Sequence, residues 1–223
     1  VRGRTGAEPT EAGRALLPHA RAALVAVEDG KRAVAEIEGS RVGSVRLGAG
    51  STAVTYILPT ILTAFRRRHP GVALSLAEMY NDALFLEIDA GRLDLAIVTG
   101  PVPGGERWID DELVLVHAPG SDPASMPFLT LTRGAATRML LDRFFPGVPI
   151  ALELASLSGI KGQVRAGMGV ALVSRLAVAT DLQLGRLVEW KRPGVPVHRE
   201  LSLLHRGVER LSPATRALRD TLL

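Results

Sequence analysis

Cysteine is absent from this chain of 223 residues, and aromatic residues make up only 4% of it. Without cysteine the chain can form no disulfide, no cysteine nucleophile and no thiolate metal site, which fits a reducing compartment. So few aromatic rings argue against a surface on which single-stranded nucleic acid would stack. There is also no apolar run near the ~20 residues that a membrane-spanning helix needs, and no secretory signal at the start. We therefore expect a cytoplasmic protein with no membrane partner.

Patterns of catalytic residues are lacking as well. The five histidines include no H-x-x-x-H or H-E-x-x-H spacing, so we expect no zinc site, and there is no G-x-S-x-G nucleophile turn. Asp110, Asp111 and Glu112 precede an expected strand, where we interpret them as a solvated loop rather than an acid–base pair. The sequence thus predicts a protein that is not an enzyme, with no catalytic residue and no bound metal.

Apolar residues, in contrast, are plentiful enough for a sizeable core. They make up 47% of the chain, whose length accommodates a long helix together with one or two compact α/β units. The formal net charge of +4 is a mild indication of a polyanionic partner.

The first forty residues predict a long helix from Thr10 to about Glu38 or Gly39. The hydroxyl of Thr10 can cap it, and Glu11 places negative charge in the first turn, where the helix dipole favours it. Small apolar residues recur inside it at alternating steps of four and three, which is the spacing of a coiled-coil seam. One helix cannot bury such a stripe alone, so we expect dimerisation with a second copy through this stripe. The stripe consists of Leu16, Ala20, Ala23, Val27, Gly30, Val34 and Ile37.

The rest of the chain alternates between strand and helix patterns. The order strand, helix, strand, helix, strand predicts right-handed crossovers and a doubly wound layer, and the second half repeats it. We expect two α/β units, with the chain returning to the first unit at its end. Expected strands are 44–48, 72–78, 93–99, 112–118, 128–131, 150–154, 170–173, 187–191 and 200–205; expected helices are 51–69, 81–91, 138–145, 156–167 and one beginning at 212.

One glycine-rich turn between strand and helix, Gly48–Ala53, fits the pattern G-x-G-x-x-A. Glu78 ends the next strand, where a ribose-binding carboxylate would lie, so dinucleotide binding is one interpretation. The other needs no cofactor: Ser51 and Thr52 put hydroxyl and N–H donors at a helix N-terminus, which binds carboxylate, sulfate or phosphate. Thr52 then contacts the ligand directly, unless it only caps the helix.

Two further helix starts and one arginine complete the candidate site. Asn81 and Ser156 begin helices, and each either contributes to a ligand site or is simply a cap. Arg133 follows a strand and is either a cation for the site or a solvated surface residue. Helix starts at one end of an α/β layer predict a cleft at the carboxyl ends of the strands.

Several motifs in this order resemble the LysR-type transcriptional regulators. Thr10–Leu17 matches that family's junction between wing and linker helix. Val45–Gly48, followed by Leu58-Pro59 and His69-Pro70, matches the start of its effector domain. Gly91–Ile97, Glu112–Val116 and Val164–Val173 are similar to its third strand, its crossover strand and a late helix–strand signature.

The resemblance implies an α/β fold: a long N-terminal linker helix followed by two Rossmann-like lobes, as in type-2 periplasmic binding proteins. It places the end of a DNA-binding wing at 1–9 and the linker helix with its connector at 10–43. Lobe I then comprises 44–118 and 185–223, and lobe II comprises 119–184. In the wing remnant, Arg2 and Arg4 would meet DNA phosphates; the alternative is a frayed terminus.

The resemblance also implies a small-molecule inducer in the cleft between the lobes, with no cofactor. The residues expected to contact it are Gly50, Ser51 and Thr52; Thr99 and Gly100; Thr132 and Arg133; and Ser156 and Leu157.

The function so implied is ligand-controlled regulation of transcription by a homodimer or homotetramer. The family's N-terminal winged helix-turn-helix is not in this sequence beyond the end of its wing, so we expect DNA contact to require that domain in a longer protein. Two alternatives remain open: a stand-alone two-lobed solute-binding protein, and a Rossmann-type oxidoreductase.

Overall fold

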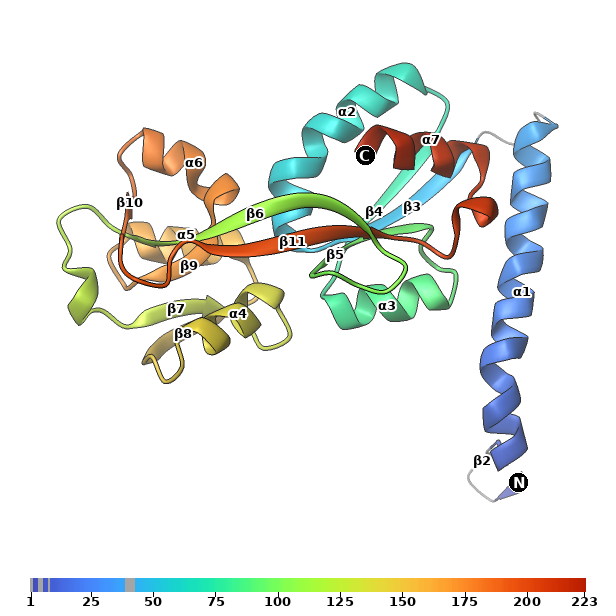
Figure 1. Ribbon diagram of the computed structural model, residues 1–223, viewed down its shortest axis with the longest axis horizontal. Coiled ribbons are helices and arrows are strands. Elements are labelled where there is room, and N and C mark those ends of the chain that lie inside the picture. The colour runs from blue at the N-terminus through green and yellow to red at the C-terminus, as the bar shows by residue number, and fades with distance from the viewer. Residues whose placement is uncertain (1, 4–5, 8, 39–42) are drawn as a thin grey trace.

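The computed structural model describes residues 2–3, 6–7, 9–38 and 43–223. A long helix, α1 (Glu11–Ile37), stands beside an elongated α/β body (Figure 1). A short antiparallel hairpin of β1 (Arg2–Gly3) and β2 (Gly6–Ala7) precedes α1. Arg4 lies outside the described residues, and only the backbone of Arg2 is described, so their contact with DNA stays a prediction.

Helix α1 begins as its sequence predicts, because Thr10 Oγ1 accepts the N–H of Gly13 at 3.1 Å. The helix continues through Pro18. One of its faces is directed toward the body and another toward solvent. Half-buried residues, including Val25 and Asp29, face the body. The predicted apolar stripe faces solvent in the single chain: Leu16 is 65% exposed, Val27 55%, Val34 53% and Ile37 75%.

The body is built on one mixed sheet of seven strands in the order β10-β6-β11-β5-β3-β4, with β9 also paired to β6. The first three strands of the body are parallel, as the strand–helix alternation predicts, and β11 returns antiparallel between β5 and β6. The strands are β3 (Ser44–Ala49), β4 (Ala73–Glu78), β5 (Leu95–Thr99), β6 (Glu106–His117), β9 (Ala171–Ser174), β10 (Val188–Glu189) and β11 (Val197–Leu204).

Lobe I has helices on both faces of its sheet. Strand β5 is a continuous apolar run, so its side chains need to be covered on both faces of the sheet. Leu95 and Ile97 pack under α2 and α7, whereas Ala96 and Val98 pack under α3. Figure 1 shows α2 and α7 on one side of the sheet and α3 on the other. These helices are α2 (Leu58–Arg68), α3 (Asn81–Asp89) and α7 (Pro213–Leu222).

Lobe II repeats this layering around the far half of β6. Leu113 and Leu115 pack against α4, and Val114 and Val116 pack against α5 and α6. The parallel pair β7–β8 extends this sheet through a bridge between Phe128 and Val170. The elements of the lobe are β7 (Phe128–Leu131), β8 (Ile150–Leu154), α4 (Ala136–Phe144), α5 (Leu157–Arg165) and α6 (Arg175–Gln183).

Strands β6 and β11 run side by side from one lobe to the other (Figure 1). Residues 113–116, Leu187 and Val197 therefore pack in the core of lobe II, although the boundaries predicted at 118 and 185 assign them to lobe I. Each of these two strands thus contributes side chains to the core of lobe I at one end and to the core of lobe II at the other. The α/β fold class with a long N-terminal helix and two lobes is confirmed.

One sequence prediction in this region is wrong, and one helix was not predicted. Strand β6 begins at Glu106 rather than at 112, so Asp110, Asp111 and Glu112 belong to a strand and not to a solvated loop. Helix α6 has no predicted counterpart, although Ser174 caps it by accepting the N–H of Leu176 at 3.2 Å. Leu176 lies on its exposed face and Asp181 on its buried face, so α6 lacks the polar–apolar periodicity of a surface helix.

The helix after β3 begins at Ser51 and passes through a wider π-helical turn, η1 (Ala53–Ile57), before α2. Leu58 donates its N–H to the carbonyl of Ala53, five residues earlier. Pro59 follows, and a proline has no N–H and clashes with the carbonyl four residues before it. The wider turn removes that clash. Two 3₁₀ turns, η2 (Pro123–Ser125) and η3 (Val208–Arg210), complete the described elements.

Candidate functional site

A cavity lies where the two lobes meet, at the carboxyl ends of β3, β5 and β7. The space between its walls, solvent at its mouth included, is about 450 Å³. We call it the cleft. The lining residues are Gly50, Ser51, Thr52, Ala53, Met79, Tyr80, Asn81, Ile97, Thr99, Leu131, Ala135, Ala136, Thr137, Arg199 and Leu201.

Three helical segments start at the cleft, and no side chain caps any of them. They are the helix that begins at Ser51 and continues into η1, together with α3, from lobe I, and α4 from lobe II. In contrast, α5, α6 and α7 start elsewhere and are each capped by a serine. The first N–H groups of a helix lack an intrahelical acceptor and carry the positive end of its dipole. The cleft therefore presents uncapped backbone donors from both lobes.

Arg199 is the one cationic side chain among the residues that line the cleft in the described part of the chain. Its side chain is only 5% exposed and forms an ion pair at 2.7 Å with Asp111, whose side chain is fully buried. Ser174 Oγ donates to the other oxygen of Asp111 at 2.7 Å. These contacts satisfy a charge pair that would otherwise be costly to bury.

The guanidinium of Arg199 also connects the lobes. It donates to Thr52 Oγ1 of lobe I at 3.0 Å and to Thr137 Oγ1 of lobe II at 3.1 Å. A second link between the lobes is the hydrogen bond of 2.8 Å between the Tyr80 hydroxyl and Thr132 Oγ1. A ligand that separates or closes the lobes must act on these contacts.

Asn81 does not cap its helix, contrary to one interpretation of the sequence. It is the first residue of α3, and its side chain pairs with the backbone of Thr99 instead. Asn81 Nδ2 donates to the Thr99 carbonyl at 2.8 Å, and Asn81 Oδ1 accepts the Thr99 N–H at 3.0 Å. This pairing fixes the end of β5 at the rim of the cleft.

The structure brings together some of the predicted site residues and separates others. Gly50, Ser51, Thr52 and Thr99 line the cleft, and the side chain of Thr52 does not cap the helix. The other predicted residues are not among its lining: Gly100, Thr132, Arg133, Ser156 and Leu157.

Four of these five residues have a visible reason for lying outside the lining. Thr132 reaches the cleft only through Tyr80, and Arg133 is exposed to solvent. Ser156 caps α5 by accepting the N–H of Gly159 at 3.2 Å, and Leu157 is buried in the core of lobe II. Contact of any of these residues with a ligand stays a prediction.

Arg199 is the main residue that sequence reasoning missed. The alternation along β11 puts Arg199 on the same buried side as Val197 and Leu201. A charged residue at an inward position of an alternating strand needs a partner in the interior. The inward position of Arg199 could therefore have identified it from the sequence as a residue with a special role. Its partner Asp111 lies 88 residues away and could not be inferred.

Two other kinds of functional feature, a metal site and a membrane-spanning helix, are absent from the described residues. No group of three or more His, Asp or Glu side chains could hold a metal ion there. Within the same residues, no helix is both long and apolar enough to cross a membrane.

Comparison with known proteins gives consistent matches over nearly the whole chain. Residues 38–223 match the family model described as the LysR substrate binding domain. The HTH-type transcriptional regulator CbbR of Xanthobacter flavus is 35% identical over 235 residues, covering 96% of this chain and 70% of the relative.

Solved structures show the same fold at lower identity. A full-length OxyR variant from Pseudomonas aeruginosa has a TM-score of 0.73 at 18% identity, covering 100% of this chain and 78% of that one. The CcmR regulatory domain of Synechocystis, solved in complex with 2-PG, has a TM-score of 0.70 at 24% identity. It covers 81% of this chain and 95% of that one.

Proposed function

The chain belongs to the family of LysR-type transcriptional regulators, and we propose that its cleft binds a small anionic effector that controls the regulator's action on DNA. The chain comprises a linker helix, α1, and the effector-binding domain of such a regulator. Its relatives are transcriptional regulators, which favours regulation over the alternatives of a solute-binding protein or an oxidoreductase.

The observation that carries the proposal is the lining of the cleft. Uncapped helix starts from both lobes meet there beside the buried Arg199. Because Asp111 already neutralises Arg199, the attraction for an anion comes mainly from the backbone donors. Ser51 and Thr99 add hydroxyl groups, and Ile97, Leu131 and Leu201 add an apolar wall. This combination suits a compact carboxylate or phosphate ester.

The proposal includes a homodimer or homotetramer held by the stripe on α1, from Leu16 to Ile37. Those side chains are exposed in the single chain, although a helix with one apolar face normally buries it. DNA would be bound through an N-terminal helix-turn-helix domain, as the names of the relatives indicate. Such a regulator would work in the cytoplasm, where it has access to DNA.

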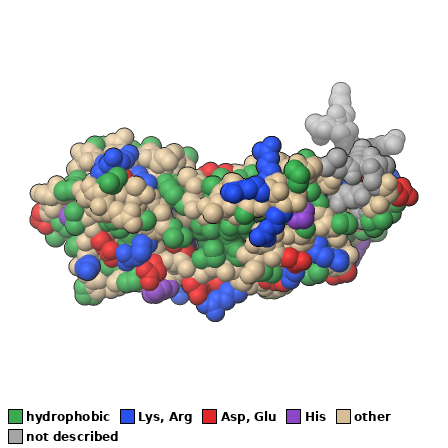
Figure 2. All heavy atoms as spheres, turned by 90° about the horizontal axis from the view of Figure 1, so that it is seen from above, with side chains coloured by type: hydrophobic (Ala, Val, Ile, Leu, Met, Phe, Trp, Pro, Cys, Tyr) green, Lys and Arg blue, Asp and Glu red, His purple; other side chains and the backbone are tan. Residues whose placement is uncertain are grey.

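The body itself is not proposed as a DNA-binding surface. On the face shown in Figure 2, Lys and Arg side chains stand in small groups among acidic, apolar and neutral ones. A DNA-binding surface usually has its basic residues clustered along one stripe. The net charge of +4 therefore does not by itself assign DNA contact to the effector-binding domain.

A thermal-shift screen of small acids, with uncharged analogues of each, tests this function. We expect at least one carboxylate or phosphate ester to raise the melting temperature, and a ligand at 100 times its Kd adds ~2.7 kcal/mol of stability. The matched variant is Ala136→Trp, which fills the cleft and should abolish the shift. Stabilisation by uncharged compounds alone would reverse the assigned charge, and a shift that persists in Ala136→Trp would place the ligand elsewhere.

A further inference from the structure

Tyr80 stands at the mouth of the cleft. Among the residues that line the cleft in the described part of the chain, Tyr80 alone is exposed to solvent, at 39%. It lies directly before α3, where the chain passes from β4 into that helix. A large ring on the solvent side of a wall that is otherwise buried or half-buried is well placed to limit what enters.

The side chain of Tyr80 crosses from lobe I to lobe II. Its hydroxyl forms the hydrogen bond of 2.8 Å with Thr132 Oγ1. Its ring lies against Gly134, where an added Cβ would be 3.2 Å from Cδ2 and 3.7 Å from Cε2 of the ring. Thr132 and Gly134 belong to the loop between β7 and α4 and are not among the lining residues. The ring therefore spans the mouth of the cleft.

Arg199 lies at the buried end of the cleft. Its guanidinium joins Thr52 of lobe I to Thr137 of lobe II, and all three residues are buried. The space for a ligand thus lies between two links that join the lobes, a buried charged link at Arg199 and an exposed neutral link at Tyr80. The distance between these two links limits the size of the ligand.

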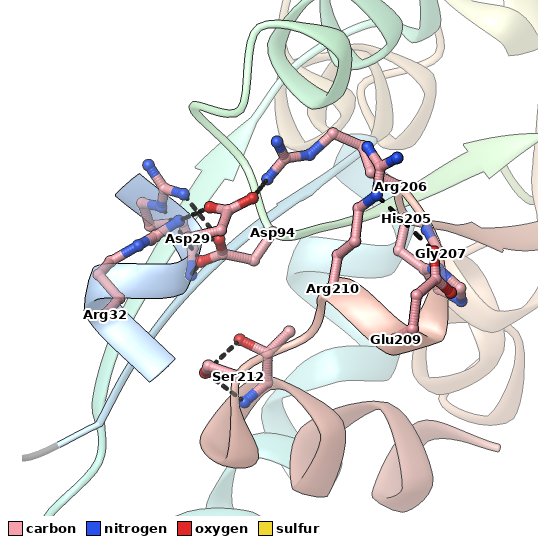
Figure 3. Close-up of polar contacts among 11 residues, drawn as sticks. Asp29, Arg32, Asp94, His205, Arg206, Gly207, Glu209, Arg210 and Ser212 are labelled. Carbon is pink, nitrogen blue, oxygen red and sulfur yellow. Dashed lines mark hydrogen bonds and ion pairs between the residues drawn. The ribbon is translucent and has the colours of Figure 1, made fainter. Parts of the chain in front are cut away.

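The contact between α1 and lobe I shows how a charged link differs from a neutral one. There the carboxylate of Asp29 pairs with the guanidinium of Arg206 at 2.7 Å (Figure 3). Hydrogen bonds that involve charged groups are roughly twice as strong as those between neutral groups. The link from Tyr80 to Thr132 joins two neutral hydroxyl groups, and Tyr80 is exposed, so this link is easier to part than the one at Arg199. A ligand is therefore expected to enter past Tyr80.

We propose that Tyr80 is a specificity-determining residue that admits compact acids to the cleft and excludes larger ones. This inference rests on the proposed ligand cleft and adds the residue that limits the size of its ligand. A compact acid reaches the helix starts beside the ring, whereas a bulky one meets the ring and the loop at Gly134. Discrimination of this kind comes from a clash that the wrong ligand cannot avoid.

An introduced thiol measures entry into the cleft without a known ligand, because the chain has no cysteine of its own. Ser51→Cys places one thiol in the wall of the cleft, at a helix start that favours the reactive thiolate. The probes are N-ethylmaleimide and fluorescein maleimide, which carry the same reactive group and differ in bulk. In this background Tyr80→Ala should raise the rate with fluorescein maleimide about tenfold, the order of discrimination that a small change in pocket size produces. The rate with N-ethylmaleimide should change little.

Two further variants separate the ring from other effects. Tyr80→Phe keeps the ring against Gly134 and loses only the hydroxyl, so it should still exclude fluorescein maleimide. Leu86→Ala shortens another exposed side chain, which lies on α3 and outside the lining, and should leave both rates unchanged. Should Tyr80→Ala unfold, which circular dichroism would report, Tyr80→Leu replaces it, with a smaller rise expected.

The outcomes distinguish this inference from the proposed function. Equal rises with both maleimides in Tyr80→Ala would show a general loosening of the lobes, and an unchanged rate with fluorescein maleimide would show that another residue limits the mouth. Either result overturns the inference, and a successful acid screen would still support the ligand cleft. A failed acid screen with size-selective labelling would instead overturn only the assigned ligand class.

Discussion

Arg199 positions the residues of the cleft rather than setting its charge, because it is deeply buried and already paired with a carboxylate. With Asp111 it forms a neutral unit that holds Thr52 and Thr137 in place across the lobe boundary. Removing one partner of such a unit leaves an uncompensated charge in the interior, which costs far more than the pair contributes. The guanidinium of Arg199 therefore holds the walls of the cleft in place. The backbone N–H groups at the helix starts are the hydrogen-bond donors that the cleft offers to a ligand.

Thr52→Val is the substitution that separates positioning from ligand contact. It keeps the shape and removes the acceptor of the bond from Arg199, so we expect the free energy of unfolding without ligand to fall by about 1.5–3 kcal/mol. Thr52→Ser restores the hydroxyl and should recover most of that loss. Denaturant unfolding and calorimetry with a compound from the screen measure both effects. Unchanged stability with weaker ligand binding would mean that Thr52 serves the ligand and not Arg199.

Asp181 is a buried carboxylate whose ionisation supports lobe II. Burial by itself would raise its pKa, but the hydrogen bond and charge of Lys161, at 2.9 Å, and the charge of Arg165 outweigh this and hold the pKa of Asp181 below its usual value. A carboxylate with a lowered folded-state pKa stabilises the fold above its unfolded pKa of ~3.9, and this contribution is lost as pH falls through the folded value.

We therefore expect Asp181→Asn to lower the free energy of unfolding by on the order of 3 kcal/mol at pH 7. The difference from the parent protein should shrink once pH falls below about 4. The measurement is urea unfolding from pH 7 to pH 3. Asp220→Asn removes an exposed carboxylate paired with its neighbour Arg219 and should have little effect at any pH. A deficit that stays constant down to pH 3 would contradict the role given to ionised Asp181.

At the scale of elements, the contact between α1 and lobe I depends on a glycine. Gly91 has a φ of +66°, a left-handed conformation that costs other residues energy, and it also leaves room for Val25. Gly120 has a similar φ of +77° but no atom within 4 Å of an added Cβ. The two glycines therefore differ in crowding and not in backbone strain.

This pair gives a controlled test of how α1 docks. Gly120→Ala should cost only the backbone strain, about 1 kcal/mol of unfolding free energy. Gly91→Ala should cost that amount and also release α1, which hydrogen exchange of the amides in α1 would report. Combining Gly91→Ala with Val25→Ala removes the clash with Val25 and leaves only the flexible end of Arg206 near the new Cβ, so it should restore protection. If Gly91→Ala and Gly120→Ala leave α1 equally protected, Val25 is not docked on Gly91 in solution.

At the scale of the whole molecule, the exposed stripe on α1 predicts self-association. Val27→Glu places like charges opposite each other in a seam of two helices, so it should shift the protein toward a monomer in sedimentation at low concentration. Ala22→Glu adds the same charge on an exposed position of α1 outside the stripe and should leave the mass unchanged. A dimer that withstands Val27→Glu would show that the stripe is not the main contact.

The sequence alone determined most of the elements, their order and the family, because these depend on patterns within a few residues. The cap at Thr10, the strand pattern from Leu95 to Thr99 and the helix start at Ser51 are local, and the structure has each of them. The tertiary structure decided which distant charges meet. Asp111 is in an interior strand because its neighbours pair with β11, and it meets Arg199 through that register. Arg133 was expected to contact a ligand in the cleft, but it is exposed to solvent instead. Burial of a charge depends on partners from other strands, and no local pattern encodes the register that brings them together.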